Sequence, residues 1–180
     1  MKSSVLKWQV AGFVFTAVLG VLLHFLFDWT GGIVPVALFS AVNESIWEHL
    51  KLLLFPMLVF AVIESRWLSK DYPAFWCIKL KGILLGLVLI PVLYYTVNGI
   101  FGQTADWVNI AIFFITVAIS YLVETRLLLN DIAQCRFPGR AQLLLWVLVL
   151  LFIVFTFLPP RIPLFQDPMT GTYGFRQMNR

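Results

Sequence analysis

Five long apolar runs, each near the length that crosses a lipid bilayer, constrain this 180-residue chain more than any other feature. The hydrocarbon core of a bilayer is about 30 Å thick, so a helix needs about 20 apolar residues to cross it. Only 12% of the residues are charged, whereas soluble domains carry about 25%. The expected fold is therefore all-α, a polytopic transmembrane helix bundle that forms one domain. The predicted spans are 5–27, 47–67, 82–101, 107–129 and 142–158, followed by an extracytoplasmic tail at 159–180.

A shorter apolar segment at 33–42 precedes the second span. As a helix it would extend only about 15 Å, which is too short to cross the bilayer. We expect either a re-entrant or interfacial half-helix or the exposed beginning of a long second span. Pro56 lies inside that span and frees the carbonyl of Leu52, which predicts a kink.

The basic residues predict the orientation in the membrane, because cytoplasmic loops are enriched in Lys and Arg. With the N-terminus in the cytoplasm, the inner side collects nine basic residues and the outer side four. The inner set is Lys2, Lys7, Arg66, Lys70, Lys79, Lys81, Arg126, Arg136 and Arg140, and the outer set is Lys51, Arg161, Arg176 and Arg180. This distribution accounts for the net charge of +4, so we expect the lipid bilayer as the partner and no nucleic acid.

The same topology sets expectations for groups at the inner side. Cys77 and Cys135 fall in predicted cytoplasmic loops, where thiols stay reduced, and their spacing is not that of a metal site. Glu64 and Glu124 lie near Arg66 and Arg126 at the inner span ends, where interfacial ion pairs are expected.

The most polar stretch of the chain is 43–51, at the predicted outer end of the second span. On a helix, Glu44, Glu48 and Lys51 would share one face, and His49 would point elsewhere, towards His24 and Asp28. If the helix begins at Ser45 instead, Ser45 and Glu48 form a capping box that needs no function.

The topology brings other polar groups to the same level and predicts a pocket in the outer half of the bundle. Tyr94, Tyr95, Asn98, Asp106 and Asn109 are expected there. The candidate ligand- or ion-binding residues are Asn43, Glu44, Glu48, His49, His24 and Asp28. A divalent metal held by His24, His49 and Glu48 is one form of such a site, because Zn²⁺ in catalytic sites takes three protein ligands and an open position.

Three function classes fit this pattern. The first is binding or transport of a cation or small polar ligand, for which five spans without a repeat would require a homo-oligomer. The second is a metal-dependent hydrolase at the outer interface, although the chain has no HExxH pattern. The third is a non-catalytic structural or partner subunit. The sequence identifies neither the ligand nor a catalytic residue.

Two motifs carry a resemblance that extends over nearly the whole chain. The stretch Asn43-Glu44-Ser45-x-Trp47-Glu48-His49 and the tail Pro163-Leu164-Phe165-x-Asp167-Pro168-x-x-Gly171-x-Tyr173-Gly174 resemble those of a family of small bacterial multi-pass membrane proteins of unknown function. The resemblance implies an integral protein of the bacterial inner (plasma) membrane and carries no activity.

The tail is too rich in proline and turn residues to form another helix. We expect it either to fold as a lid that places Asp167, Tyr173 or Arg161 near the polar cluster, or to remain loosely attached.

Overall fold

The computed structural model describes residues 2–102, 105–130 and 135–175, and within these ranges the chain is all-helical. The elements are α1 (Lys2–Trp29), α2 (Val34–Ala37), α3 (Ile46–Leu68), α4 (Phe75–Phe101), α5 (Asp106–Leu129), α6 (Pro138–Phe157) and a 3-10 turn, η1 (Pro163–Phe165). All but α2 and η1 are long and apolar enough to cross a membrane. The predicted all-α bundle with five apolar spans is confirmed, and residues 176–180 of the predicted tail lie outside the described ranges.

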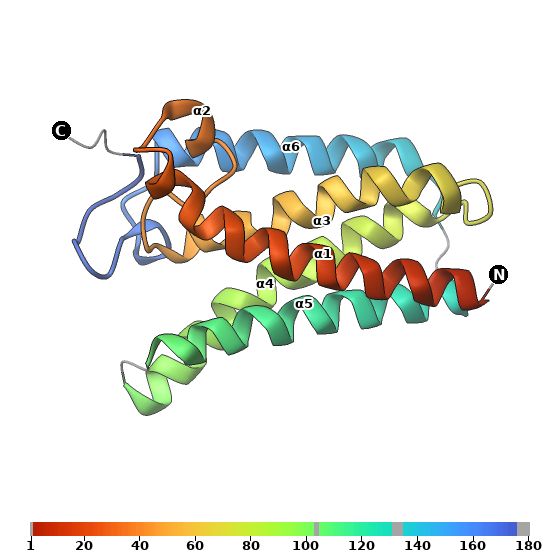
Figure 1. The fold of residues 1–180 in the computed structure, drawn as a ribbon, viewed down its shortest axis with the longest axis horizontal. Coiled ribbons are helices and arrows are strands. Elements are labelled where there is room, and N and C mark those ends of the chain that lie inside the picture. Colours follow the sequence, from red (N-terminus) through yellow and green to blue (C-terminus); the bar gives the residue numbers. More distant parts are fainter. Residues whose placement is uncertain (1, 103–104, 131–134, 176–180) are drawn as a thin grey trace.

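The most buried of the five long helices is α3, which packs against α1, α4 and α6 (Figure 1). The main core is built on α3 and includes the fully buried Leu53 and Leu54, with Ile83 from α4 and Val117 from α5 packed against them. We call the end of the bundle where α1 ends and α3 begins the distal end, and the opposite end the proximal end.

The segment between α1 and α3 shows why α3 starts where it does. Ser45 is the N-cap, and its hydroxyl accepts a hydrogen bond from the backbone N–H of Glu48 at 3.4 Å. The capped helix therefore begins at Ile46, and the long second span proposed as an alternative is wrong. The predicted half-helix is the single turn α2.

The helix α3 continues through Pro56, whose ring removes the donor that would bind the carbonyl of Leu52. Gly20 of α1 approaches this carbonyl so closely that a Cβ on Gly20 would lie 2.7 Å from the oxygen. The packing of α1 on α3 therefore requires a residue without a side chain at this point.

The helix α4 begins at Phe75 rather than at about Gly82, so Lys79 lies inside the bundle and not in a loop. A lysine is tolerated there because its Nζ atom is 2.5 Å from Glu64 Oε2 and 2.6 Å from Glu124 Oε2. The expected pairs with arginines are wrong. Both acids are buried and bind Lys79, while Arg66 and Arg126 are exposed.

The expectation of two reduced loop thiols is also wrong. Cys77 lies in α4 and forms a disulfide with Cys135, which precedes α6, with Cα atoms 6.0 Å apart. The early start of α4 explains the difference, because it brings Cys77 out of the predicted loop and next to the α5–α6 connection.

Candidate functional site

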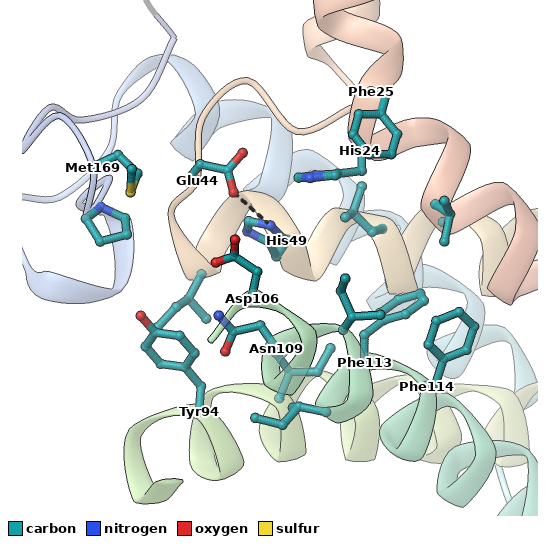
Figure 2. A pocket seen from close by; sticks show the side chains of 18 residues that line it. His24, Phe25, Glu44, His49, Tyr94, Asp106, Asn109, Phe113, Phe114 and Met169 are labelled. Atoms are coloured by element: carbon teal, nitrogen blue, oxygen red, sulfur yellow. Dashed lines mark ion pairs between the residues drawn. The ribbon is translucent and has the colours of Figure 1, made fainter. Parts of the chain in front are cut away.

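A cavity of about 580 Å³ opens at the distal end of the bundle, between the described parts of α1, α3, α4 and α5. Most of its wall is apolar, as expected of a small-molecule site, with a few convergent polar groups. Its polar residues are His24, Glu44, His49, Tyr94, Asp106 and Asn109. Figure 2 shows His24, Glu44 and His49 turned towards one another, with Asp106 and Asn109 contributed by α5 and Tyr94 by α4.

Three of these residues form a cluster of metal-ligand type. His24, Glu44 and His49 each offer one ligand atom, and the three atoms all lie within 4.8 Å of one another. The imidazole centroids of His24 and His49 are 5.1 Å apart. His49 Nε2 is 3.4 Å from Glu44 Oε2, close to the separation of about 3.3 Å expected for two ligands at 2.0–2.1 Å from one tetrahedral Zn²⁺.

A hydrogen bond at the start of α3 fixes the tautomer of His49. Its Nδ1 atom lies 2.9 Å from the carbonyl oxygen of Ser45. Because a carbonyl oxygen can only accept, Nδ1 carries a hydrogen, and in the neutral ring Nε2 presents its lone pair to the Glu44 carboxylate. A proton or a metal ion between these two acceptors would make their close approach favourable. Such an outer hydrogen bond to a backbone carbonyl is typical of metal-binding histidines.

His24 supplies a second sign of an incomplete site. Its Nδ1 atom is buried and makes no hydrogen bond within the described part of the chain. A buried polar atom without a partner costs about 1–3 kcal/mol. A ligand that reaches Nδ1 would satisfy this demand.

Glu48 and Lys51 belong to a separate, fully buried cluster. Glu48 Oε2 lies 2.5 Å from Lys51 Nζ, which also donates to the carbonyl of Ala37 at 2.8 Å. Thr156 of α6 donates to Glu48 Oε1 at 3.0 Å. The predicted patch of Glu44, Glu48 and Lys51 is therefore wrong, because α3 begins after Glu44 and its carboxylate turns to His49 instead. Glu48 joins α2, α3 and α6 and is not one of the clustered metal-ligand residues.

Two further candidates take other positions. The Asn43 side chain accepts from Ser45 N at 2.9 Å and donates to the Gly174 carbonyl at 3.1 Å, so it links α3 to the tail. Asp28 is exposed and is not among the residues lining the cavity. Of the six candidates, the structure brings together His24, Glu44 and His49.

The tail is attached at the distal end and reaches the cavity with Pro168 and Met169. The Phe165 ring packs on Trp47 with centroids 4.6 Å apart, and Phe175 N donates to the Thr156 carbonyl at 2.7 Å. The expectation of a loosely attached tail is therefore wrong for the described residues.

The three polar residues expected from the tail do not line the cavity. Asp167 closes its own turn by accepting from Met169 N at 2.8 Å, Tyr173 forms an isolated bridge with Gln166, and Arg161 is exposed. Met169 was missed because a methionine within a turn gives no signal of chemistry.

The polar residues predicted at the same level divide into two groups. Tyr94, Asp106 and Asn109 line the cavity, whereas Tyr95 and Asn98 do not. Tyr95 is exposed, and the Asn98 amide donates to the Tyr94 carbonyl at 2.9 Å. Sequence spacing gave the level of these residues along their helices but not the direction of each side chain.

Comparison with known proteins gives a family and no activity. No curated protein and no solved structure matches the chain. The family model described as "Family of unknown function (DUF6512)" matches residues 1–175. The chain therefore belongs to this family, whose model covers the apolar helices, the His24–Glu44–His49 cluster and the tail.

Proposed function

We propose that this protein binds a divalent transition-metal cation through His24, Glu44 and His49 at the distal end of a membrane-embedded bundle. The observation that carries the proposal is the convergence of three ligand atoms within 4.8 Å. Two imidazoles and one carboxylate favour Zn²⁺ or a similar ion, because Mg²⁺ and Ca²⁺ prefer oxygen ligands.

The spacing of the ligand atoms suits a mononuclear site. The largest separation, up to 4.8 Å, exceeds the tetrahedral value by about 1.5 Å, so closure on a metal needs movements of under about 1 Å per ligand. Glu44 is 51% exposed and lies before the first turn of α3, so its side chain is free to make this movement.

Metal content tests the proposal directly. We expect detergent-purified full-length protein to retain a stoichiometric Zn²⁺ after dialysis. His24→Ala, His49→Ala and Glu44→Gln should each lose it. The affinity should fall by more than the roughly 10- to 100-fold seen when a residue that only hydrogen-bonds to a metal ligand is removed. Inductively coupled plasma mass spectrometry measures the metal, and circular dichroism verifies the helices.

Asp28→Asn is the matched control, since Asp28 is an exposed acid one turn from His24 that does not line the cavity. This variant should keep its Zn²⁺. Stoichiometric Zn²⁺ in all three ligand variants would contradict the proposal.

A second candidate function, hydrolysis of an amphipathic substrate, is favoured by what surrounds the cluster. Three protein ligands leave one coordination position for water, and the cavity beside it contains the Asp106 carboxylate together with apolar walls such as Phe113 and Phe114. In this function the metal ion would activate the water, Asp106 would accept its proton, and the apolar walls would hold a hydrocarbon chain.

Two assays separate hydrolysis from transport. Hydrolysis of a fluorogenic long-chain ester in mixed micelles should be lost in Asp106→Asn while the Zn²⁺ content stays unchanged. Transport predicts instead a Zn²⁺-dependent signal from a dye trapped in proteoliposomes. Equal hydrolysis by wild type and Asp106→Asn would exclude the role given to Asp106.

A further inference from the structure

A second polar cluster lies in the proximal half of the bundle and shares no residue with the distal cavity. Glu64 of α3 and Glu124 of α5 both pair with Lys79 of α4, at 2.5 Å and 2.6 Å. Gln9 of α1 donates its Nε2 hydrogen to Glu64 Oε1 at 2.7 Å. These four side chains come from four helices, and none of the four residues is more than 2% exposed.

The charges of this cluster do not balance if both acids are ionised. Two carboxylates and one ammonium leave one negative charge, and burial of an uncompensated charge costs several kcal/mol. Tyr121 also faces the cluster, with Lys79 Nζ 5.5 Å from its ring centroid, but its hydroxyl is hydrogen-bonded to Thr16 at 2.9 Å and the neutral phenol adds no charge. The cluster therefore needs one more positive charge, which a single proton supplies.

The hydrogen-bond pattern shows which carboxyl group carries the proton. Glu64 Oε1 accepts a hydrogen bond from the Gln9 amide. Its Oε2 makes no hydrogen bond in the described ranges but lies 2.5 Å from the Lys79 ammonium, so each oxygen faces a positive or donor group, as expected for an ionised carboxylate. Glu124 accepts from Lys79 through Oε2, whereas its buried Oε1 has neither a hydrogen bond nor an ion pair within the described ranges. Oε1 is thus the oxygen that can bear a hydrogen.

Polar side chains with no partner in the described chain continue from Glu124 along α5 towards the cavity. Ser120 and Thr116, one and two turns away, are fully buried with unpartnered hydroxyls. Positions four apart on a helix are about 6 Å apart, a distance that one water molecule bridges. On α4, Gly86 and Gly82 leave space for the side chains of Ser120 and Glu124. A Cβ on Gly86 would lie 3.0 Å from Ser120 Oγ, and one on Gly82 would overlap Glu124 Oε1.

From these contacts we propose that the Glu64–Lys79–Glu124 cluster is a proton-binding site, in which Glu124 holds one exchangeable proton that reaches it along Ser120 and Thr116. This site is independent of the His24–Glu44–His49 cluster. The two share no residue, and Glu64, Lys79 and Glu124 do not line the distal cavity.

Infrared spectroscopy of the purified full-length protein tests the proton directly. At neutral pH the wild type should show the carbonyl band of a protonated carboxylic acid, and this band should shift in D₂O. Glu124→Gln should lose it, since the amide replaces the neutral acid and leaves Glu64 and Lys79 balanced. Asp71→Asn is the control, because Asp71 is exposed and its loss should leave the band unchanged.

A second variant keeps the test decisive if Glu124→Gln does not fold. Glu64→Gln removes the surplus charge from the other side, so Glu124 should ionise against Lys79 and the band should again disappear. Ser120→Ala should retain the band but slow its shift in D₂O. A wild-type spectrum without the band, or a band that persists in either glutamine variant, would overturn the proton site, and an unchanged exchange rate in Ser120→Ala would overturn the route.

Discussion

The sequence predicts that Glu48 binds a ligand, but in the fold Glu48 forms a buried ion pair. Its carboxylate accepts from Val42 N at 3.1 Å and pairs with Lys51, and both charged residues are at most 1% exposed. Removal of one partner from such a pair leaves a buried charge without compensation, which typically costs 3–5 kcal/mol. The pair holds α2 and α6 to the start of α3, where His49 of the cavity also lies.

Lys51→Met should therefore lower the free energy of unfolding by about 3–5 kcal/mol. The loss comes from the Glu48 carboxylate, which would remain buried without its positive partner. The methionine side chain is apolar and adds no such cost. Thermal unfolding of the detergent-solubilised protein measures the effect. The double variant Glu48→Gln/Lys51→Met should recover most of the loss, and a double variant as unstable as Lys51→Met alone would show that the charge is not the cause.

The candidate site could be predicted only in part at this scale, and helix phase explains why. The sequence identified His24, Glu44 and His49, but it left open whether the helix extends back past Ser45, which would place Glu44 on the face of Glu48, or begins at Ser45. Because Ser45 is the N-cap, Glu44 lies outside the helix and does not follow its periodicity. Its carboxylate turns to His49 instead. A capping residue thus decides which carboxylate joins the histidines.

At the scale of the helices, close approach at glycine sets the packing of α1. A Cβ on Gly20 would lie 2.7 Å from the Leu52 carbonyl oxygen and 2.6 Å from Cζ of Phe113. The oxygen is part of the α3 backbone and cannot move aside as a flexible side chain would. The helices would have to separate where α1 and α3 both border the distal cavity.

We accordingly expect Gly20→Ala to destabilise the protein by about 1–3 kcal/mol, the usual cost of overpacking, and to weaken Zn²⁺ binding by displacing His24 from His49. Gly99→Ala in α4 is the matched control, because a Cβ at Gly99 meets nothing within 4 Å. That change should be neutral or stabilise the helix by about 0.5–1 kcal/mol. Thermal unfolding and metal content measure both effects, and equal behaviour of the two variants would contradict this account of the helix contact.

Hydropathy predicted the five long helices well but missed the first turns of α4, and the reason is electrostatic. Lys79 and Lys81 made this segment resemble a loop, since hydropathy treats each lysine as solvated. Lys79 instead pairs with acids from α3 and α5. A pairing between distant segments cannot be found from local hydropathy. The close packing of Gly82 against Glu124 and of Gly86 against Ser120 accompanies this pairing in the structure.

For the whole molecule, two features favour opposite orientations in a membrane. Lys79 and Lys51 are buried, so the described residues leave eight basic residues at the proximal end against Arg161 at the distal end, and Arg176 and Arg180 lie outside the described ranges. Because cytoplasmic loops are enriched in Lys and Arg, this excess favours a cytoplasmic proximal end. The Cys77–Cys135 disulfide lies at the same end, and disulfides persist mainly outside the reducing cytoplasm.

The basic residues act during membrane insertion, before the disulfide forms. We therefore expect the charge bias, and not the disulfide, to decide the orientation. Arg161 and Lys70 are exposed at the distal and proximal ends and serve as reporters. In a Cys77→Ser/Cys135→Ser background, a membrane-impermeant maleimide should label Arg161→Cys in intact cells and Lys70→Cys only after permeabilisation. The opposite pattern would place the disulfide in an oxidising compartment and the metal cavity on the cytoplasmic side, where its ligand would have to be a cytosolic cation.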